Sequence, residues 1–303
     1  DRILDDDFDK IFSRSIYEHG KHIIQNLEYS TVLTTNHYLA NIAGLLFVAT
    51  YLESSHETDF WLMFSWQELI SEFKKQFRAD GANFESSTAY HCLSLEMIVY
   101  SVALTLGVSR ERKLKASARN YVRYSMHYPF LRSSDQQEFD VNSDTFFPSW
   151  FIERLYKSIR FVEDIKKPDG NIAQIGDNDS GKFLKFFTHG TFLSNEEARN
   201  KYLNLSAYTA PRQDKYWDEN LLNHDDIVNA GYSLFSQYQN RPESFERSFI
   251  RSLTAQTFSY SHEDSDSPQR SSEFQIPGDF LRKESRVDFE LDHHVELNEL
   301  KCW

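Results

Sequence analysis

Three short polar clusters stand at turns or at the starts of expected helices. The first is residues 34–37, TTNH, the second is residues 80–91, DGANFESSTAYH, and the third is residues 176–181, GDNDSG. Amides, imidazoles, phenols and carboxylates are groups that hold anions and move protons in enzymes. Because backbone N–H groups at a helix N-terminus also favour a nearby anion, the first two clusters predict anion-binding positions.

Four side chains in the first two clusters also fit ordinary structural roles. Asn36 fits the N-cap of its helix, a position that asparagine favours. Tyr90 lies on an apolar stripe, as a core tyrosine with a satisfied hydroxyl would. His37 and His91 equally fit packing or capping positions. Taken singly, none of the four predicts a catalytic site.

The third cluster partly resembles a calcium-binding loop. Asp177 and Asp179 alternate with other residues, but the spacing and the terminal glutamate of an EF-hand are absent, which excludes that motif. A turn whose carboxylates bind its own backbone is favoured instead. Cys92 and Cys302 match no metal or redox spacing, and Cys92 fits a small buried hydrophobic residue. The sequence therefore predicts no metal site.

The elements that must position these residues are mainly helical. Apolar residues recur at three- and four-residue spacings in six segments separated by turn signals. This pattern predicts helices over Phe8–Gln25, His37–Leu52, Trp61–Phe77, Ser87–Leu106, Arg110–His127 and Pro148–Asp164.

Two of the expected helices, His37–Leu52 and Ser87–Leu106, are apolar on nearly every side, which is typical of helices buried all round. The helix between them carries Glu68 and Glu72, as an outer, half-exposed helix would. Alternating buried and outer helices predict a mainly α fold with two helical layers. We therefore expect an incomplete α/α toroid, a double-layered helical barrel.

The expected domain boundary lies after residue 225, with the toroid in residues 1–225 and a polar tail in residues 226–303. Near the end of the tail, Val287, Phe289 and Leu291 alternate with charged residues, as in a strand. The tail is therefore expected to be the start or remnant of a β-sandwich domain.

Composition narrows the range of partners. With 40% hydrophobic and 15% aromatic residues, 303 residues can bury a sizeable core. The formal charge of −13 argues against nucleic acid as a partner, since such binding needs a basic face. No apolar run reaches 18 residues, so no membrane partner is expected. The chain starts at Asp1, so a signal peptide is expected to lie upstream or to have been removed.

Taken together, the three clusters carry a resemblance to a known family. The run at residues 36–41, NHYLAN, precedes one buried helix, and the run at residues 80–91 precedes the other. This ordered pair, with the loop at 176–181, resembles the heparinase II/III-like polysaccharide lyases and the related oligoalginate lyases. The resemblance covers about residues 20–190, and each element by itself is weakly specific.

The resemblance implies β-elimination on an acidic, uronate-containing polysaccharide, without a cofactor. Asn36, with His37, would neutralise the uronate carboxylate, and Tyr90 would act as general base, general acid or both. An unperturbed phenol has a pKa of about 10, so Tyr90 would need a nearby positive group, such as a protonated histidine, or hydrogen-bond donors. The remaining candidates, which would contact the sugar, are Glu85, His91, Asp177 and Asp179. The resemblance also implies a periplasmic or secreted protein.

The sequence departs from the family pattern in one respect. The resemblance implies a β-sandwich whose Gly/His-rich segment supplies a further catalytic histidine, and no such segment is found. His262 and the pair at 293–294 lack the flanking glycines. The chain is therefore expected to be a fragment or a degenerate relative. A carbohydrate-binding protein without turnover stays open, as does an α/α-barrel glycoside hydrolase using two carboxylates.

Overall fold

The computed structural model describes residues 5–119, 138–178, 182–184, 186, 190–205, 215–254 and 256–260. The chain divides into two units, Asp1–Tyr260 and Ser261–Trp303, and all the described residues lie in the first. The predicted strand near residue 289, His262, the histidines at 293–294 and Cys302 lie outside them.

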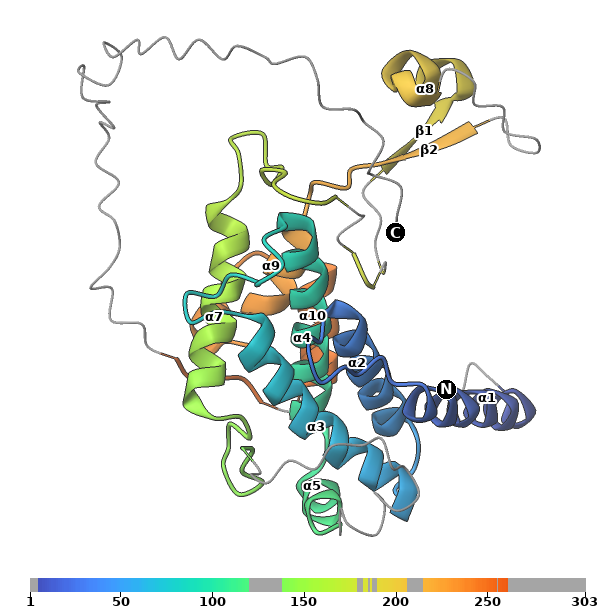
Figure 1. Ribbon diagram of the computed structural model, residues 1–303, viewed down its shortest axis with the longest axis vertical. Coiled ribbons are helices and arrows are strands. Elements are labelled where there is room, and N and C mark those ends of the chain that lie inside the picture. Colours follow the sequence, from blue (N-terminus) through green and yellow to red (C-terminus); the bar gives the residue numbers. More distant parts are fainter. Residues whose placement is uncertain are drawn as a thin grey trace. The chain divides into compact units, whose positions relative to one another are not determined.

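The described residues are mainly helical, which confirms the predicted α class (Figure 1). The incomplete, double-layered α/α toroid stays a prediction. Two strands, β1 (Gly190–Ser194) and β2 (Lys215–Glu219), pair antiparallel, with Phe192 opposite Trp217. The helices are α1 (Asp6–Gln25), α2 (Asn36–Tyr51), α3 (His56–Gln76), α4 (Thr88–Gly107), α5 (Arg110–Ser117), α7 (Ser149–Asp164), α8 (Asn195–Lys201), α9 (Asp225–Tyr232) and α10 (Phe245–Leu253), with 3-10 turns at Leu203–Leu205 and Ser236–Tyr238.

Serine and threonine side chains fix where four helices begin. Thr35, Ser55, Ser87 and Ser109 occupy the N-caps of α2, α3, α4 and α5, and each accepts a hydrogen bond from a backbone N–H of the first turn. Such caps satisfy donors that a helix N-terminus otherwise leaves open. The starts of α2 and α4, where the polar clusters lie, are therefore set by short polar side chains.

The helix α3 lies inside the fold, so its predicted place in an outer layer is wrong. Trp61 and Trp66 are fully buried, and Glu68 and Glu72 are buried with them. The hydroxyl of Tyr38 donates to Glu68 at 2.7 Å, and α3 packs closely against α2. Buried carboxylates are tolerated when hydrogen-bonded, which the charge pattern of α3 alone does not reveal.

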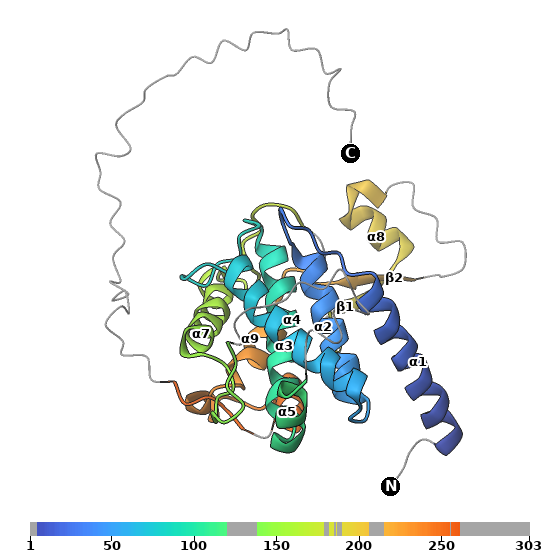
Figure 2. The same ribbon diagram turned by 60° about the horizontal axis from the view of Figure 1, so that its bottom comes forward.

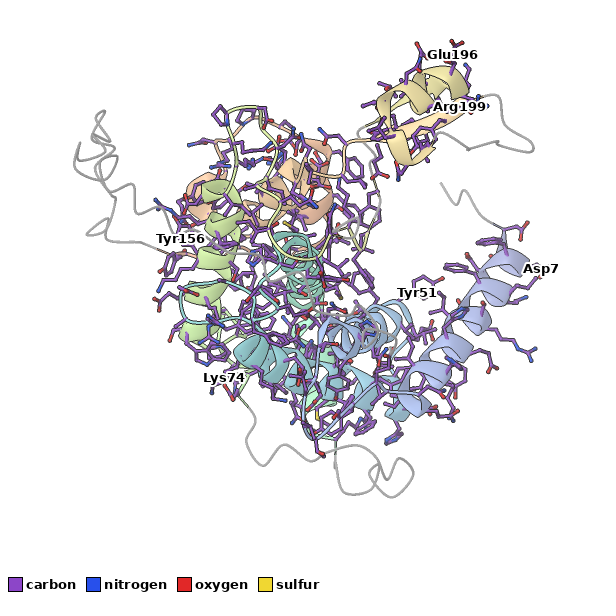
Figure 3. All side chains as sticks on the ribbon, turned by 45° about the horizontal axis from the view of Figure 1, so that its top comes forward. Asp7, Tyr51, Lys74, Tyr156, Glu196 and Arg199 are labelled. Atoms are coloured by element: carbon purple, nitrogen blue, oxygen red, sulfur yellow. The ribbon has the colours of Figure 1, made fainter. Side chains whose placement is uncertain are left out.

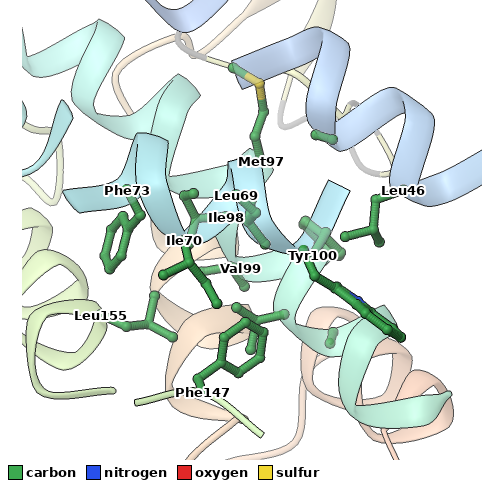
Figure 4. Packing of buried hydrophobic residues seen from close by; sticks show 14 of the residues in the cluster. Leu46, Leu69, Ile70, Phe73, Met97, Ile98, Val99, Tyr100, Phe147 and Leu155 are labelled. Carbon is green, nitrogen blue, oxygen red and sulfur yellow. The ribbon is translucent and has the colours of Figure 1, made fainter. Parts of the chain in front are cut away.

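The core is built from α2, α3, α4 and α7 (Figure 2). Figure 4 shows the residues that α3 and α4 contribute at its centre, with Leu155 of α7 packed beside them. As predicted, Cys92 on α4 is fully buried. The helix α4 has the length and apolar composition of a membrane span, yet most of it is buried inside the fold, as in a core helix.

The helices α9 and α10 follow the predicted boundary at residue 225, and both pack against α4. A Cβ added at Gly107, the last residue of α4, would lie only 1.9 Å from the carbonyl oxygen of Leu253 in α10. Glycine therefore permits this close approach. Residues 225–254 form part of the helical unit.

Candidate functional site

The start of α2 leaves the side chain of Asn36 available for a role other than capping. Thr35 is the N-cap, and its side chain accepts the N–H of His37. Asn36 is buried, and its Nδ2 donates to Oε2 of Glu85 at 3.2 Å. Its backbone N–H donates to Oε1 of Glu85 at 3.3 Å. The capping interpretation of Asn36 is therefore wrong, and its amide faces the second polar cluster.

Glu85 is held by its neighbours in the turn before α4. Its backbone N–H donates to Oδ1 of Asn83 at 2.9 Å. The next residue, Ser86, has a φ of 57°, in the left-handed region that non-glycine residues rarely adopt. Ser87 then caps α4. A backbone held in such a conformation by surrounding contacts is typical of functional sites.

Tyr90 lies in the first turn of α4, five residues after Glu85 along the same segment. Its backbone N–H donates to Oγ of Ser87 at 3.1 Å, and its side chain is half-buried. Within the part of the chain that the structure describes, its hydroxyl makes no hydrogen bond. The hydrogen bond expected of the hydroxyl in a core tyrosine is therefore not found among the described residues.

The third cluster is attached to the start of α4. The carbonyl oxygen of Ile175 accepts the N–H of Thr88 at 3.0 Å, and that of Asp177 accepts the hydroxyl of Ser87 at 2.6 Å. Gly176 has a φ of 74°, and an added Cβ would lie 2.7 Å from the carbonyl oxygen of Ser86. The side chain of Asp177 is exposed beside this turn. Asp179 lies outside the described residues.

His91 is a structural residue, which corrects its predicted role in contacting sugar. It is buried, Nδ1 accepts the N–H of Asn83 at 3.2 Å, and Nε2 donates to the carbonyl oxygen of Ser158 at 3.1 Å. Burial lowers its pKa to about 4, against the weaker raising effect of the Ser158 hydrogen bond. A neutral imidazole with both nitrogens occupied supplies no positive charge to Tyr90.

His37 lies on the outside of the first turn of α2. Its side chain is 66% exposed, and Nδ1 lies 2.9 Å from Oε2 of Glu28. The backbone N–H of Glu28 donates in turn to Asn41, so the segment before α2 is tied to the helix. His37 is accessible to a ligand but faces a carboxylate.

A buried carboxylate beside the start of α2 was missed, because α3 was expected on the outside. Glu72 accepts from Thr34 at 2.6 Å and from Gln76 at 3.1 Å, and it pairs with Lys75 at 2.7 Å. A cavity of about 270 Å³ adjoins these groups, lined by residues 29–34 with Lys75, Gln76 and Phe84. Glu72 therefore supports the segment that leads into Asn36.

The buried carboxylate of Glu96 holds the segment that follows the third cluster. The N–H groups of Phe183 and Leu184 donate to Glu96 of α4, and burial raises the pKa of that carboxyl to about 7. The ammonium of Lys182, buried as well, lies 3.3 Å from Asp226 of α9. These contacts hold the segment after the loop between α4 and α9.

Other polar surfaces in the fold offer less specific chemistry. A cavity of about 670 Å³ is lined by amides, among them Asn171, Gln174 and Asn178, and by residues of the β1–β2 hairpin. Within the described ranges, no three histidine, cysteine, aspartate or glutamate side chains gather as metal ligands would. The starts of α2 and α4 therefore form the candidate site.

Comparison with protein families finds a match in the first part of the chain. Residues 2–137 match the family model described as heparinase II/III N-terminus. The matched range contains Asn36, His37, Glu85 and Tyr90, and it ends before the loop around Gly176. No curated protein and no solved structure matches the chain. This match over residues 2–137 supports a likeness to the heparinase II/III-like family.

Proposed function

We propose that this chain is a polysaccharide lyase that cleaves a uronate-containing polysaccharide by β-elimination. The observation that carries the proposal is the hydrogen bonding of Asn36 to Glu85, on the segment that leads into Tyr90. This hydrogen bonding joins the amide of Asn36, at the start of α2, to the turn before α4. The phenol of Tyr90 lies in the first turn of α4. The match of residues 2–137 to the heparinase II/III N-terminus supports the same reaction class.

The reaction first requires the charge of the uronate carboxylate to be neutralised, so that the carbanion formed at C5 can be stabilised as an enolate. The C5 proton is barely acidic while that carboxylate carries a full negative charge. Asn36 would donate its second amide N–H to the carboxylate, close to the positive end of the α2 dipole. A donor aimed at charge that develops in the transition state typically contributes about 2.7–4 kcal/mol.

Tyr90 would then move the proton. As the phenolate, its oxygen would take the C5 proton, a C4–C5 double bond would form, and the C4–oxygen bond would break. The same phenol would return a proton to the leaving glycosidic oxygen. A hydroxyl without a hydrogen bond among the described residues supports this role, and acid–base help of this kind contributes about 10²–10⁴-fold.

His37 would be an additional donor to the carboxylate. It follows Asn36 directly and its ring is exposed, so a ligand at the start of α2 can reach it. Because His91 is neutral and buried, His37 is the imidazole of these two clusters that fits such contact.

A carbohydrate-binding protein without turnover is the second candidate. Such a protein would use the same amide and hydroxyl groups to hold sugar but would break no bond.

Product analysis distinguishes these activities. The full chain is incubated with a soluble polyuronate, and ultraviolet absorbance and new reducing ends are followed together. A lyase raises both, because each cleavage leaves an unsaturated uronyl end. Reducing ends without absorbance would contradict the proposal and indicate a glycoside hydrolase. Retardation in a polyuronate affinity gel with neither signal would indicate the binding protein.

A further inference from the structure

The carboxylate of Glu85 places a fixed negative charge beside the proposed uronate position. An amide carries two N–H hydrogens, and Glu85 takes one from Asn36 across 3.2 Å. A ligand oxygen bound by the other, at an ordinary distance of about 2.9 Å, would lie within about 6 Å of Glu85. Any ligand of Asn36 therefore meets this charge at close range.

The backbone at Glu85 is held by its neighbours, and its carboxylate has no cationic partner in the described part of the chain. Its backbone is tied to Asn83 and is followed by the left-handed Ser86 and the cap at Ser87. Among the residues that the structure describes, no lysine, arginine or histidine forms an ion pair with it. Its charge therefore acts on the ligand.

A second carboxylate adds negative charge near the start of α4. The side chain of Asp177 is exposed on the loop that contacts Ser87, and the chain as a whole carries a formal charge of −13. Lys75, beside the neighbouring cavity, is engaged by Glu72 at 2.7 Å. A uronate brings one carboxylate, which the amide of Asn36 can hold. A sugar that also carries a sulfate brings a further negative charge, which Glu85 and Asp177 repel.

We propose that Glu85 is a specificity-determining residue that selects unsulfated polyuronates over sulfated ones. The inference rests on the proposed function for the place where the uronate binds. A sulfate that comes as close to Glu85 as the bound carboxylate does, about 6 Å, would meet repulsion equivalent to a discrimination on the order of ten- to a hundred-fold. Glu85 would then shape substrate choice while Asn36 and Tyr90 carry out the reaction.

The test compares alginate with the same polymer after chemical sulfation. The full-length wild type and the Glu85→Gln variant are assayed for kcat/KM and for retardation in affinity gels containing each polymer. Glutamine keeps an acceptor for Asn36 and removes the charge. The matched control is Glu196→Gln, which makes the same charge change on the exposed helix α8 (Figure 3).

We expect the wild type to prefer alginate by at least about ten-fold, and Glu85→Gln to lose most of that preference while Glu196→Gln keeps it. Raising the salt concentration should shrink the wild-type preference, a readout that needs no variant. The inference would be overturned if the wild type showed equal kcat/KM and equal gel retardation for the two polymers. It would also be overturned if Glu85→Gln kept the wild-type preference. Preference in gels without elimination would refute the lyase reaction and leave the specificity intact; binding to neither polymer would refute both.

Discussion

Glu85 accepts hydrogen bonds from the backbone N–H and the side-chain amide of Asn36, at 3.3 and 3.2 Å. Through this pair, the first residue of α2 is joined to the turn that precedes α4. The two helices are both buried, so their starts are held in place by the core. A site built on such starts needs little reorganisation when a ligand binds.

Replacing Asn36 with alanine should lower kcat by about 10²–10³-fold, because the lost donor acts mainly on charge that develops in the transition state. KM should change much less. Steady-state kinetics on a polyuronate measures both values, and thermal unfolding checks that the variant folds. A rise in KM alone would instead assign Asn36 to substrate holding.

Gly176→Ala should reduce turnover more than it reduces stability. An added Cβ would lie 2.7 Å from the carbonyl oxygen of Ser86, at a φ of 74° that alanine rarely adopts. The loop would then move away from Ser87 and Thr88 at the start of α4. Kinetics and thermal unfolding are measured together, with Gly170→Ala as the control: Gly170 also has a positive φ, but no atom lies within 4 Å of an added Cβ. Equal loss of activity in both variants would show that loop contact with α4 is irrelevant.

His91 should make the fold less stable in acid. Its pKa is about 4 in the fold and about 6.5 in the unfolded chain, so the unfolded chain binds the extra proton between these values. The stability that the neutral ring contributes is present above pH 6.5 and is lost as the pH falls to about 4, a change of roughly 3 kcal/mol.

The check is the free energy of unfolding in denaturant across this pH range, for the wild type and for His91→Gln. Glutamine can accept from Asn83 and donate to Ser158, as the histidine does. The variant should show a shallower loss of stability on acidification. Parallel curves for the two proteins would contradict the assigned burial of a neutral His91.

The positions of α2, α4 and α7 followed from the sequence, because apolar spacing and capping residues act locally. The predicted ranges of α2 and α4 differ from the observed ones by one residue at each end, and that of α7 by one residue at its start. The helices α8, α9 and α10 were not predicted. The burial of α3 could not be predicted from the sequence. Its carboxylates Glu68 and Glu72 accept hydrogen bonds from Tyr38 and Thr34, which lie far from them along the chain. Charge pattern alone cannot report such partners.

The candidate site was predictable in part for the same reason. The sequence singled out Asn36, Glu85 and Tyr90, but not the hydrogen bonds that join Asn36 to Glu85. It also assigned His91 to the ligand, although the partners that bury it, Asn83 and Ser158, become visible only in three dimensions. Local motifs thus locate a site, while tertiary contacts decide which side chains face it.

Tyr38→Phe should destabilise the fold by about 1–3 kcal/mol, because it removes a 2.7 Å hydrogen bond to the buried carboxylate of Glu68. Chemical denaturation gives the free energy of unfolding. The control is Tyr51→Phe at the end of α2, whose ring is exposed (Figure 3) and which should change stability little. A Tyr38→Phe variant as stable as this control would contradict the assigned buried hydrogen bond.

The proposed lyase reaction is tested most directly by Tyr90→Phe. This variant removes one half-buried hydroxyl that has no hydrogen-bond partner in the described part of the chain, so folding should be close to that of the wild type. The measurement is the rate of ultraviolet-absorbing product formation from a polyuronate by the two full-length proteins. We predict elimination by the wild type and loss of turnover, with polymer binding kept, in Tyr90→Phe. A variant that eliminates at the wild-type rate would contradict the role of Tyr90 and, with it, the proposed mechanism.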